Sequence, residues 1–342
     1  MRVLGIDTTA DDTCAAVVED GRTILSNVVF SQSSLHARFG GIVPQIASYE
    51  HLKNVLPAVD TALAEASLRL EAVDLFAVGQ SPDPALNYYL ISLTTSKVFS
   101  VIFNKPLIGV DHMEGHFLAN FAEHRDLVFP FVSLTVAGGH TLLSYVSDFG
   151  SYEILGSTRD DAAGEAFDKV ARLLRLGYPG GPLIDLAAEK GNEKSFVLPS
   201  PMIHDASLDF SYAGLKTAVW RLVKSLEKDY PQGLPSLMVS DIAASFRRAA
   251  VKVLVEKLFK AASIKKVGAV VLGGGVAANQ LIRSEVTREG AARGLRVVLP
   301  SLKLCTDNAV GTAVAAFYKF RKCGGDDPLT LKHYRERPLM NW

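Results

Sequence analysis

The chain opens with Arg2-Val3-Leu4-Gly5-Ile6, a short apolar run that predicts a β-strand. A polar loop follows at residues 7–12, and a turn at Asp20-Gly21 separates two further predicted strands, at residues 13–18 and 23–30. The start of the chain is therefore expected to form strand, loop, strand, turn and strand.

A comparable order returns in the middle of the chain. Residues 131–136 predict a strand, the glycine loop Ala137-Gly138-Gly139-His140 follows, and two more strands are expected at residues 141–146 and 152–155. The repetition predicts an internal duplication, with two similar domains that face each other across a cleft and point their loops into it. Because hairpins are common in proteins, a coincidental match is the alternative.

Strands and helices alternate after these hairpins, which predicts an α/β fold. The expected elements are a helix at 45–66, a strand at 73–79, a helix at 85–103, a strand at 106–110, a core-facing amphipathic helix at 241–262, a strand at 267–272, a helix at 276–293 and a strand at 296–299. The helix at 85–103 contains Ser92 and Lys97 among its apolar residues, so we expect a buried helix and not a membrane span.

Length and composition indicate a globular protein of two domains. The chain has 342 residues, 48% of them hydrophobic, and we expect domains at 1–129 and 130–322 with a tail at 323–342. Lys+Arg 36 balance Asp+Glu 36, so nucleic-acid contact must come from local patches. Three cysteines without a CxxC pair predict a reducing compartment, and residues 1–7 lack the features of a signal peptide, so a cytoplasmic location is expected.

Two histidines, His112 and His116, stand four residues apart on a predicted helix. At about 100° per residue they lie about 40° apart on one face, so both imidazoles can bind one metal ion. Glu114 lies about 200° from His112, which excludes the HExxH motif of metalloproteases, where glutamate directly follows the first histidine. Two ordinary histidines on a helix face are the alternative.

A carboxylate near the end of the chain would complete such a site. Asp307 lies at a predicted junction between a strand and a helix that ends near Lys322. Two histidines and one carboxylate leave coordination positions open for substrate or water, as catalytic metal sites do. The alternative is that Asp307 caps the helix, and spacing alone does not choose between them.

Acidic and glycine-rich stretches in the second half predict a ligand site. Asp160 or Asp161 could simply cap a helix, whereas Asp168 lies on nearly the same helical face as Asp161 and is harder to explain as a cap. Gly180-Gly181 lie in a turn where backbone can approach a ligand, and a helix is expected from Leu183.

A triple glycine, Gly273-Gly274-Gly275, precedes the predicted helix at 276–293. It would free backbone amides at a helix N-terminus to approach a phosphate, ribose or base, and a tight turn between strand and helix is the alternative. Asn279, one turn into that helix, could hydrogen-bond a ligand held against the loop.

Together these motifs resemble the tRNA threonylcarbamoyladenosine transferase family (TsaD type), within the superfamily of actin, Hsp70 and sugar kinases. The similarity extends from Met1 to about Phe320. It rests on Gly5-Ile6-Asp7-Thr8, Asp11-Asp12-Thr13, Ser31-Gln32, Gly40-Gly41-Ile42-Val43-Pro44, His112-Met113-Glu114-Gly115-His116, Gly138-Gly139-His140-Thr141, the run from Asp160 to Lys169, Tyr178-Pro179-Gly180-Gly181-Pro182, Phe210-Ser211, Gly214-Leu215-Lys216-Thr217, the run from Gly274 to Asn279, and Cys305-Thr306-Asp307-Asn308.

The resemblance implies an α/β fold of two duplicated actin/Hsp70/sugar-kinase-like (RNase H-like) domains flanking a nucleotide cleft. It implies transfer of the threonylcarbamoyl group from threonylcarbamoyl-AMP to N6 of adenosine-37 in tRNAs that read codons beginning with A, with release of AMP.

The resemblance also implies roles for individual residues. One divalent metal per subunit, Fe(2+) or Zn(2+), would be bound by His112, His116 and Asp307. The adenylate and its attached group would be bound by Thr135, Val136, Ala137, Gly138, Gly139, Asp168, Gly181, Asp185 and Asn279. Because an exocyclic amine of adenine is a poor nucleophile, a carboxylate would take or orient its proton, and Asp11 is the candidate.

Members of this family usually work with companions. The resemblance implies a paralogous inactive subunit (TsaB type) that binds the N-terminal half and a small ATPase subunit (TsaE type), with no membrane. A basic C-terminal segment could contact phosphates of tRNA, and a solvated helix end and tail is the alternative. Its residues are Lys319, Arg321, Lys322, Lys332, Arg335 and Arg337.

The N-terminal half departs from the family pattern. Residues 80–86 replace the usual glycine-proline-glycine-leucine loop, Gln45 and Asp7 stand where glutamate is usual, and Ala10 replaces a small cysteine or serine-type residue. Two alternatives follow: a metal- and nucleotide-binding subunit with reduced or lost transferase activity, or an ATPase or kinase of the same superfamily. The histidine pair argues against a kinase, because Mg²⁺ prefers oxygen ligands.

Overall fold

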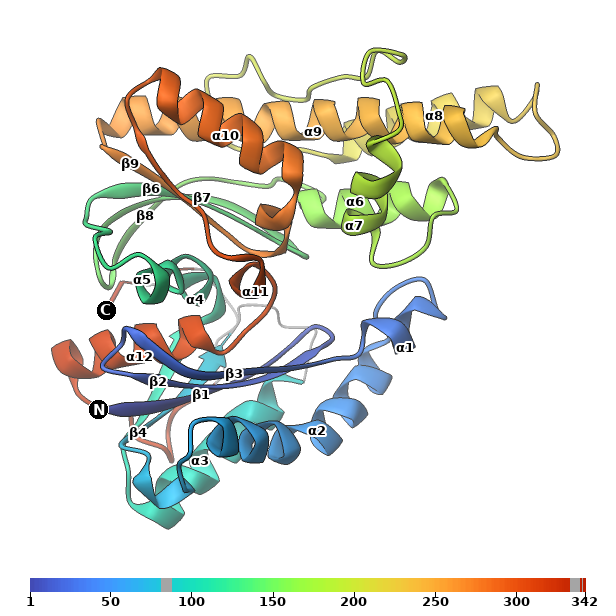
Figure 1. The fold of residues 1–342 in the computed structure, drawn as a ribbon. Helices are drawn as coiled ribbons and strands as arrows, with labels where there is room; N and C mark the ends of the chain where they lie inside the picture. The colour runs from blue at the N-terminus through green and yellow to red at the C-terminus, as the bar shows by residue number, and fades with distance from the viewer. Residues whose placement is uncertain (81–87, 333–338, 340) are drawn as a thin grey trace. The chain divides into compact units, whose positions relative to one another are not determined.

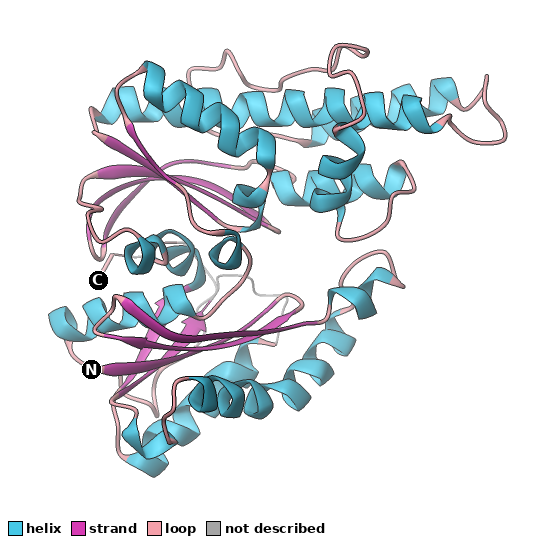
Figure 2. Cartoon of the chain, in the orientation of Figure 1, coloured by secondary structure: helices cyan, strands magenta, loops and turns pink. Residues whose placement is uncertain are grey.

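The computed structural model describes residues 1–80, 88–332, 339 and 341–342. The altered loop at Ser81 to Pro84 and the candidate tRNA-binding residues Arg335 and Arg337 lie outside these ranges. The chain forms two compact units, each with its own sheet and helices (Figures 1 and 2). The first unit comprises Met1–Phe129, Ser147–Tyr152 and Pro300–Trp342, and the second comprises Pro130–Val146 and Glu153–Leu299.

The first unit is built on a five-stranded sheet in the order β3-β2-β1-β4-β5. The strands are β1 (Arg2–Thr9), β2 (Asp12–Glu19), β3 (Thr23–Ser31), β4 (Leu75–Gln80) and β5 (Leu107–Asp111). The helices are α1 (Ser33–Ala37), α2 (Pro44–Glu65), α3 (Tyr89–Phe103), α4 (His112–Leu118), α5 (Asn120–Glu123), α11 (Leu302–Cys305) and α12 (Val310–Cys323), with a 3₁₀ helix, η1 (Leu70–Ala72).

Helices cover both faces of this sheet. On one face α2 packs on β2 and β3 while α3 packs on β1 and β4, and on the other face α12 packs on β1, β2, β4 and β5 (Figure 1). Because both faces are covered, β1, β2 and β4 are apolar and almost wholly buried along their lengths.

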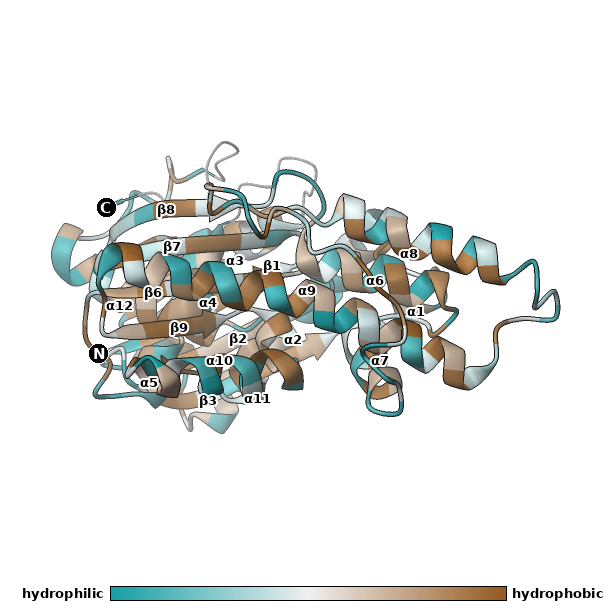
Figure 3. Ribbon diagram, turned by 90° about the horizontal axis from the view of Figure 1, so that it is seen from above, coloured by the Kyte–Doolittle hydropathy of each residue, from teal (hydrophilic) through white to brown (hydrophobic). Residues whose placement is uncertain are grey.

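The second unit repeats this plan around the sheet β10-β9-β6-β7-β8. Its strands are β6 (Phe131–Ala137), β7 (His140–Asp148), β8 (Ser151–Ser157), β9 (Ala269–Gly273) and β10 (Arg296–Val298). Its helices are α6 (Ala163–Leu173), α7 (Gly180–Ala188), α8 (Ala213–Leu226), α9 (Ser236–Lys265) and α10 (Gln280–Ala292), with a 3₁₀ helix, η2 (Gly275–Ala278). Strands β6, β7 and β9 are coloured mainly as hydrophobic in Figure 3.

The strand order confirms the predicted duplication. In the first sheet β1 runs antiparallel to β2 and parallel to β4, and in the second sheet β6 runs antiparallel to β7 and parallel to β9. Each unit therefore begins with antiparallel strands and continues with parallel ones reached through helices. A coincidence of hairpins does not explain two five-stranded sheets of the same order.

The last part of the chain corrects the predicted domain division. Residues 300–322 were expected in the second domain, but they pack with the first unit. The physical reason is that α12 buries Val310, Ala313 and Val314 completely while it contacts four strands of the first sheet. A carbonyl of α4 also comes so close that a Cβ on Gly311 would lie 1.9 Å from the Gly115 oxygen.

Three predicted helices differ from the observed ones. The segment expected as a buried helix at 85–103 is described as α3 from Tyr89, and Val101 and Ile102 are 58% and 67% exposed, because only one face of α3 packs on the sheet. The helix expected from Leu183 begins at Gly180, since Pro182 is tolerated in the first turn, where its missing N–H has no partner to lose. The helix expected at 276–293 is divided at Asn279 into η2 and α10.

Within the ranges described by the structure, no helix combines the length and apolar character needed to cross a membrane.

Candidate metal centre and nucleotide-binding residues

Helix α4 starts where strand β5 ends, and a carboxylate fixes this junction. The side chain of Asp111 accepts the N–H groups of Met113 at 2.7 Å and Glu114 at 3.3 Å, so it caps the helix. The capped start fixes the helical turn that carries both histidines. His112 and His116 lie on one face of α4 and are 5% and 3% exposed.

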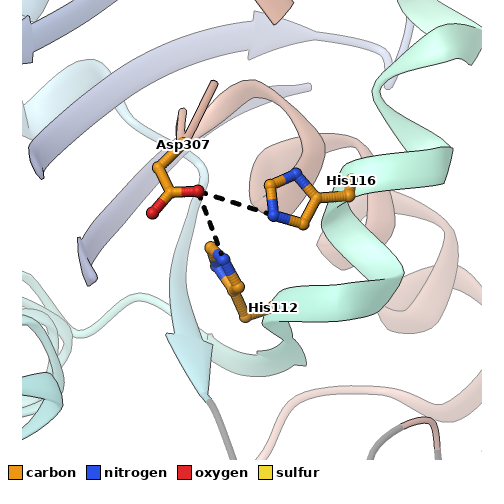
Figure 4. A group of neighbouring side chains, drawn as sticks. All are labelled: His112, His116 and Asp307. Atoms are coloured by element: carbon orange, nitrogen blue, oxygen red, sulfur yellow. Dashed lines mark ion pairs between the residues drawn. The ribbon is translucent and has the colours of Figure 1, made fainter. Parts of the chain in front are cut away.

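Asp307 faces this histidine pair (Figure 4). Its Oδ1 lies 3.6 Å from His112 Nε2 and 3.5 Å from His116 Nε2. The alternative role as a helix cap is excluded, because α12 begins at Val310 and Asn308 Oδ1 accepts the N–H of Val310 at 3.1 Å. The side chain of Asp307 is thus directed to the imidazoles.

The donor atoms suit a divalent transition-metal ion. One ligand atom from each of His112, His116 and Asp307 lies within 4.8 Å of the others. Around a tetrahedral ion with bonds of about 2.0–2.2 Å, donors lie about 3.4 Å apart, close to the separations found here. Two imidazoles and one carboxylate match zinc or ferrous iron better than magnesium or calcium.

A second carboxylate orients His112. Asp7 Oδ2 lies 3.2 Å from His112 Nδ1, and Thr312 Oγ1 donates to the same oxygen at 3.3 Å. Holding Nδ1 in this way turns Nε2 toward Asp307, as carboxylates behind metal-binding histidines commonly do. Gly79 on β4 leaves room for Asp7, since a Cβ there would lie 2.0 Å from its Oδ2.

Sequence reasoning did not identify Asp7 as a site residue. The available signal was topological, because parallel strands bring their carboxyl ends to one edge of a sheet. Asp7 lies near the end of β1, and β1, β4 and β5 are parallel neighbours in the sheet. A search of these strand ends for carboxylates would have found it.

The charges around the site favour a cation. Burial alone would lower the pKa of His112, but the carboxylates of Asp7 and Asp307 raise the pKa well above its usual range. Burial and the nearby charges of Asp307 and Asp11 raise the pKa of Asp12 to about 7. The two carboxylates that favour a positive charge on His112 would also favour a metal ion bound beside it.

The other face of α4 is held by the end of the chain. Glu114 is 1% exposed and accepts hydrogen bonds from Tyr152 Oη at 2.5 Å and Trp342 Nε1 at 2.9 Å. Burial is the main reason why the pKa of Glu114 rises to about 7. The N–H of Leu339 also donates to Asp111 Oδ2 at 2.9 Å, so the C-terminal residues contact both the cap and the back of α4.

Asp11, the candidate base, lies in the turn between β1 and β2. Its carbonyl accepts the N–H of Gln32 at 2.7 Å, and its charge contributes to the raised pKa of Asp12. Its place beside Asp12 brings it near the charges of the metal set, while its role in proton transfer stays a prediction.

The predicted adenylate residues all lie in the second unit. Thr135, Val136 and Ala137 form the end of β6, and Gly138 and Gly139 form the turn to β7. A Cβ on Gly138 or Gly139 would meet no atom within 4 Å, so the turn is open. The start of α6 packs on this turn, where the N–H of Glu165 donates to the Gly138 carbonyl at 3.2 Å.

Two of these residues contact each other directly. Asn279 Nδ2 donates to Asp185 Oδ1 at 2.6 Å, and the Asn279 side chain also accepts the N–H of Ile282 at 3.0 Å at the start of α10. Arg247 Nη1 donates to the same Asp185 oxygen at 3.1 Å. Sequence reasoning missed Arg247, whose position within the long helix α9 gave no signal.

Asp168 and the triple glycine have definite structural roles. Asp168 Oδ1 accepts the N–H of Gly180 at 2.7 Å, next to Gly181, where a Cβ would meet no atom within 4 Å. Gly274 has φ +85°, and a Cβ there would lie 2.5 Å from the Val136 carbonyl, so this glycine allows η2 to approach the end of β6.

The helix-cap interpretation of Asp160 and Asp161 was wrong for α6, whose N-cap is Ala162. Asp160 Oδ1 accepts the N–H of Tyr212 at 2.8 Å, at the start of α8. Asp161 instead forms ion pairs with Lys169 and Lys216.

Comparisons with known proteins agree with this fold and these residues. The family model described as tRNA N6-adenosine threonylcarbamoyltransferase matches residues 23–314. The enzyme of that name from Clostridium perfringens (strain SM101) is 43% identical over 320 residues, covering 94% of this chain and 93% of the relative. That from Clostridium botulinum (strain 657) is 45% identical over 323 residues, covering 94% and 93%.

Solved structures share the fold at low sequence identity. Full-length HypF in its phosphate- and nucleotide-bound form superposes with TM-score 0.61 at 12% identity, covering 95% of this chain and 47% of HypF. Component A of the Acidaminococcus fermentans (R)-2-hydroxyglutaryl-CoA dehydratase superposes with TM-score 0.55 at 16% identity, covering 93% and 98%. The two units thus form the actin- and sugar-kinase-like α/β fold.

The extent of the family match and the identity to its members lead to one assignment: the chain belongs to the tRNA N6-adenosine threonylcarbamoyltransferase family, whose members modify tRNA.

Proposed function

We propose that this transferase takes the threonylcarbamoyl group from threonylcarbamoyl-AMP and attaches it to N6 of adenosine-37 in tRNAs that read codons beginning with A, releasing AMP. The observation that carries the proposal is the meeting of His112, His116 and Asp307 in one buried set, although Asp307 lies about 190 residues after the histidines. A cytoplasmic location, where tRNA is found, belongs to the same proposal.

We assign donor binding to the second unit. The open turn at Gly138 and Gly139 offers backbone N–H groups that can stabilise phosphate charge. With Thr135, Val136 and Ala137 it would hold the donor's phosphate, while the linked pair Asp185 and Asn279 would hold ribose or base hydroxyl and amino groups. Asp168 would act through the backbone of Gly180 and Gly181, which it orders.

We assign one divalent ion, Fe(2+) or Zn(2+), to His112, His116 and Asp307 in each subunit. When bound, such an ion supplies Lewis-acid polarisation of carbonyl and phosphate oxygens. The chain's own contribution is orientation, because Asp7 holds the ring of His112 and Asp111 caps the helix that carries both imidazoles. Asp11 would accept or orient the proton of the attacking amine.

The N-terminal half offers a surface for the paralogous subunit (TsaB type). Tyr49, Leu52 and Leu56 are 63%, 65% and 53% exposed and follow helical spacing along one face of α2. Val101 and Ile102 are similarly exposed on the neighbouring helix α3. Apolar side chains gathered on two adjacent helices favour a protein partner there. The small ATPase subunit (TsaE type) completes the proposed set.

The decisive experiment is a transfer assay with matched variants. Purified chain, with the companion subunits, threonylcarbamoyl-AMP and unmodified tRNA, is expected to yield the modified nucleoside by mass spectrometry. His112→Ala and Asp307→Asn should lower both product and bound metal. His124, which lies after α5 and outside the metal set, provides the control variant His124→Ala.

Two outcomes would contradict the proposal in different ways. Metal and nucleotide binding without product, in a partner set that is active with another family member, would indicate a binding subunit that has lost transfer. ATP turnover without tRNA or partners would instead support an ATPase or kinase of the same fold.

A further inference from the structure

Helix α8 exposes a tryptophan. Trp220 keeps 50% of its surface exposed, and in the described part of the chain no aromatic ring or cation stacks on its indole. Trp342, by contrast, donates its Nε1–H to Glu114 and lies beside the Lys322 ammonium at 5.5 Å. An exposed indole without such contacts is typical of a surface that binds another molecule.

The indole lies at a cavity between two helices of the second unit. The cavity has a volume of about 390 Å³ and is lined by Lys169, Arg172 and Leu173 near the end of α6 and by Lys216, Thr217 and Trp220 on α8. We call it the α6–α8 pocket. Its volume lies in the range of small-ligand sites, about 300–1,000 Å³.

The described lining of this pocket contains three cations, Lys169, Arg172 and Lys216, and no acidic residue, although the chain as a whole is neutral. Helix α8 contains Lys216, Arg221 and Lys224 and no acidic residue. Arg172 adds another cation on the α6 side. The lining therefore presents cations around one apolar ring.

Carboxylates beside the pocket fix the positions of its two lining lysines. Both Lys169 and Lys216 pair with the carboxylate of Asp161, and Lys169 also pairs with Glu165 at 2.9 Å. Their chains are thereby ordered beside the indole, while Arg172 and Arg221 provide exposed charge, and the exposed Lys224 pairs with Glu227 at 2.7 Å. The pocket therefore has ordered lysines in its lining and exposed cations around them.

We propose that the α6–α8 pocket binds an unpaired nucleotide of the tRNA substrate, with its base stacked on Trp220 and adjacent phosphates contacted by Arg172 and Arg221. The inference rests on tRNA being the substrate and locates part of its binding surface. Aromatic stacking between cations is how proteins commonly bind unpaired nucleotides. Inorganic phosphate would use the cations but not the indole, whereas RNA uses both.

The predicted basic segment near the C-terminus is less suited to this role. Lys319 donates to the Gly109 carbonyl at 2.8 Å, and Lys322 donates to the Phe149 carbonyl at 2.9 Å. These ammonium groups bind the first unit's own backbone. The cations near Trp220 lie beside an exposed aromatic ring. The described residues from Lys319 to Lys322 include no exposed aromatic ring.

The test is tRNA binding without donor, measured by fluorescence anisotropy of labelled unmodified tRNA, with the chain alone and with its companion subunits. Trp220→Ala is expected to weaken binding roughly 5- to 150-fold, the loss of one base–aromatic stack. Trp220→Tyr should restore most of it. Arg172→Gln should reduce the magnitude of the slope of log K for tRNA binding against log salt concentration by about 0.7–0.9, the value for one lost phosphate contact.

Arg288→Gln on α10 is the matched control, because Arg288 is exposed in the same unit but lies outside the α6–α8 pocket. Binding of this variant should change less than about twofold. Unchanged binding by Trp220→Ala, or displacement of tRNA by polyglutamate as readily as by RNA, would overturn the proposal. Since no donor is present, failure of the transfer chemistry would leave this result interpretable.

In the transfer assay Trp220→Ala should raise the KM for tRNA and leave kcat nearly unchanged at saturating tRNA. A loss confined to kcat would refute a binding role for the pocket. Thermal unfolding of the variant should match that of the wild type, because the side chain is half exposed.

Discussion

At residue 79 the lack of a side chain sets the position of Asp7, which in turn orients His112. Gly79→Ala would place a Cβ 2.0 Å from Asp7 Oδ2, so the carboxylate must move away from His112 Nδ1. Because such supporting carboxylates contribute about 10- to 100-fold to metal affinity, we expect a loss of that size, measured by competition with a chelator. Gly268→Ala is the control, since a Cβ there meets no atom within 4 Å. Equal affinity in both variants would show that Asp7 does not matter for the metal.

A buried histidine of the same unit should make stability depend on pH. His51 lies between Thr13 Oγ1 at 2.9 Å and the Ala10 carbonyl at 3.2 Å, and burial lowers its pKa from 6.5 to about 4. At this residue the unfolded chain therefore binds a proton that the folded chain does not, and the contribution of His51 to stability falls as pH decreases from about 6.5 to about 4. The full effect of His51 is roughly 3 kcal/mol. The raised carboxyl pKa values of Asp12 and Glu114 act in the opposite direction.

Urea unfolding at pH 7 and pH 4.5 measures this contribution. His51→Gln should raise the unfolding free energy at pH 4.5 relative to that at pH 7, compared with the wild type, whereas His204→Gln, at an exposed position, should keep the wild-type difference. A wild-type difference that survives in His51→Gln would assign the acid sensitivity to other groups.

At the scale of elements, the end of the chain acts as a brace for α4. The indole Nε1–H of Trp342 donates to the buried carboxylate of Glu114, and the backbone N–H of Trp342 donates to the Gly150 carbonyl at 3.0 Å. Trp342→Phe keeps most of the ring but leaves Glu114 with one donor fewer. We expect a loss of about 1–3 kcal/mol in unfolding free energy, the range for removing one partner of a buried acceptor, measured by urea denaturation.

The second tryptophan provides the control for this measurement. Trp220→Phe changes an exposed side chain and should alter the unfolding free energy by less than about 0.5 kcal/mol. Equal effects of the two substitutions would mean that the bond to Glu114 contributes nothing to stability.

At the scale of the whole molecule, the proposed metal ligands lie in one unit and the predicted adenylate residues in the other. A ligand present at 100 times its dissociation constant stabilises the unit that binds it by about 2.7 kcal/mol. In calorimetry of the intact protein, we expect zinc to raise the temperature of one unfolding transition and AMP to raise the temperature of a different one. His116→Ala should abolish only the zinc shift, and Asn279→Ala only the AMP shift. Loss of both shifts in either variant would show that the assigned residues do not act separately.

Sequence patterns predicted local and repeated features well. The hairpins of residues 2–30 and 131–155 revealed the duplication because the period of a strand is visible in neighbouring residues. The helical period brought His112 and His116 together for the same reason. Spacing left Asp307 open as a ligand or a cap, and the fold gives the bond to the Val310 N–H to Asn308 instead.

Features that depend on distant partners were not predictable in this way. Asp7 lies 105 residues from His112, and Trp342 lies 228 residues from Glu114. Which face of α3 stays exposed depends on where α2 and the sheet lie, and hydropathy alone made the whole helix look buried. Pairing across such separations is a property of the tertiary fold, which local periodicity does not record.

The divided first unit has a consequence for how the protein is made. Met1–Phe129 leave the ribosome first, but Asp307 and α12, which belong to the same unit, follow only after the whole second unit has been made. At about 5–20 residues per second, the histidines wait roughly ten to forty seconds for their carboxylate partner. During that interval the nascent chain exposes the face of β1, β2 and β4 that α12 later covers, and His112 and His116 lack Asp307. Binding of a metal ion by the proposed set would therefore wait until residue 307 is made, and a message truncated before residue 300 yields a first unit with neither its covering helix nor Asp307.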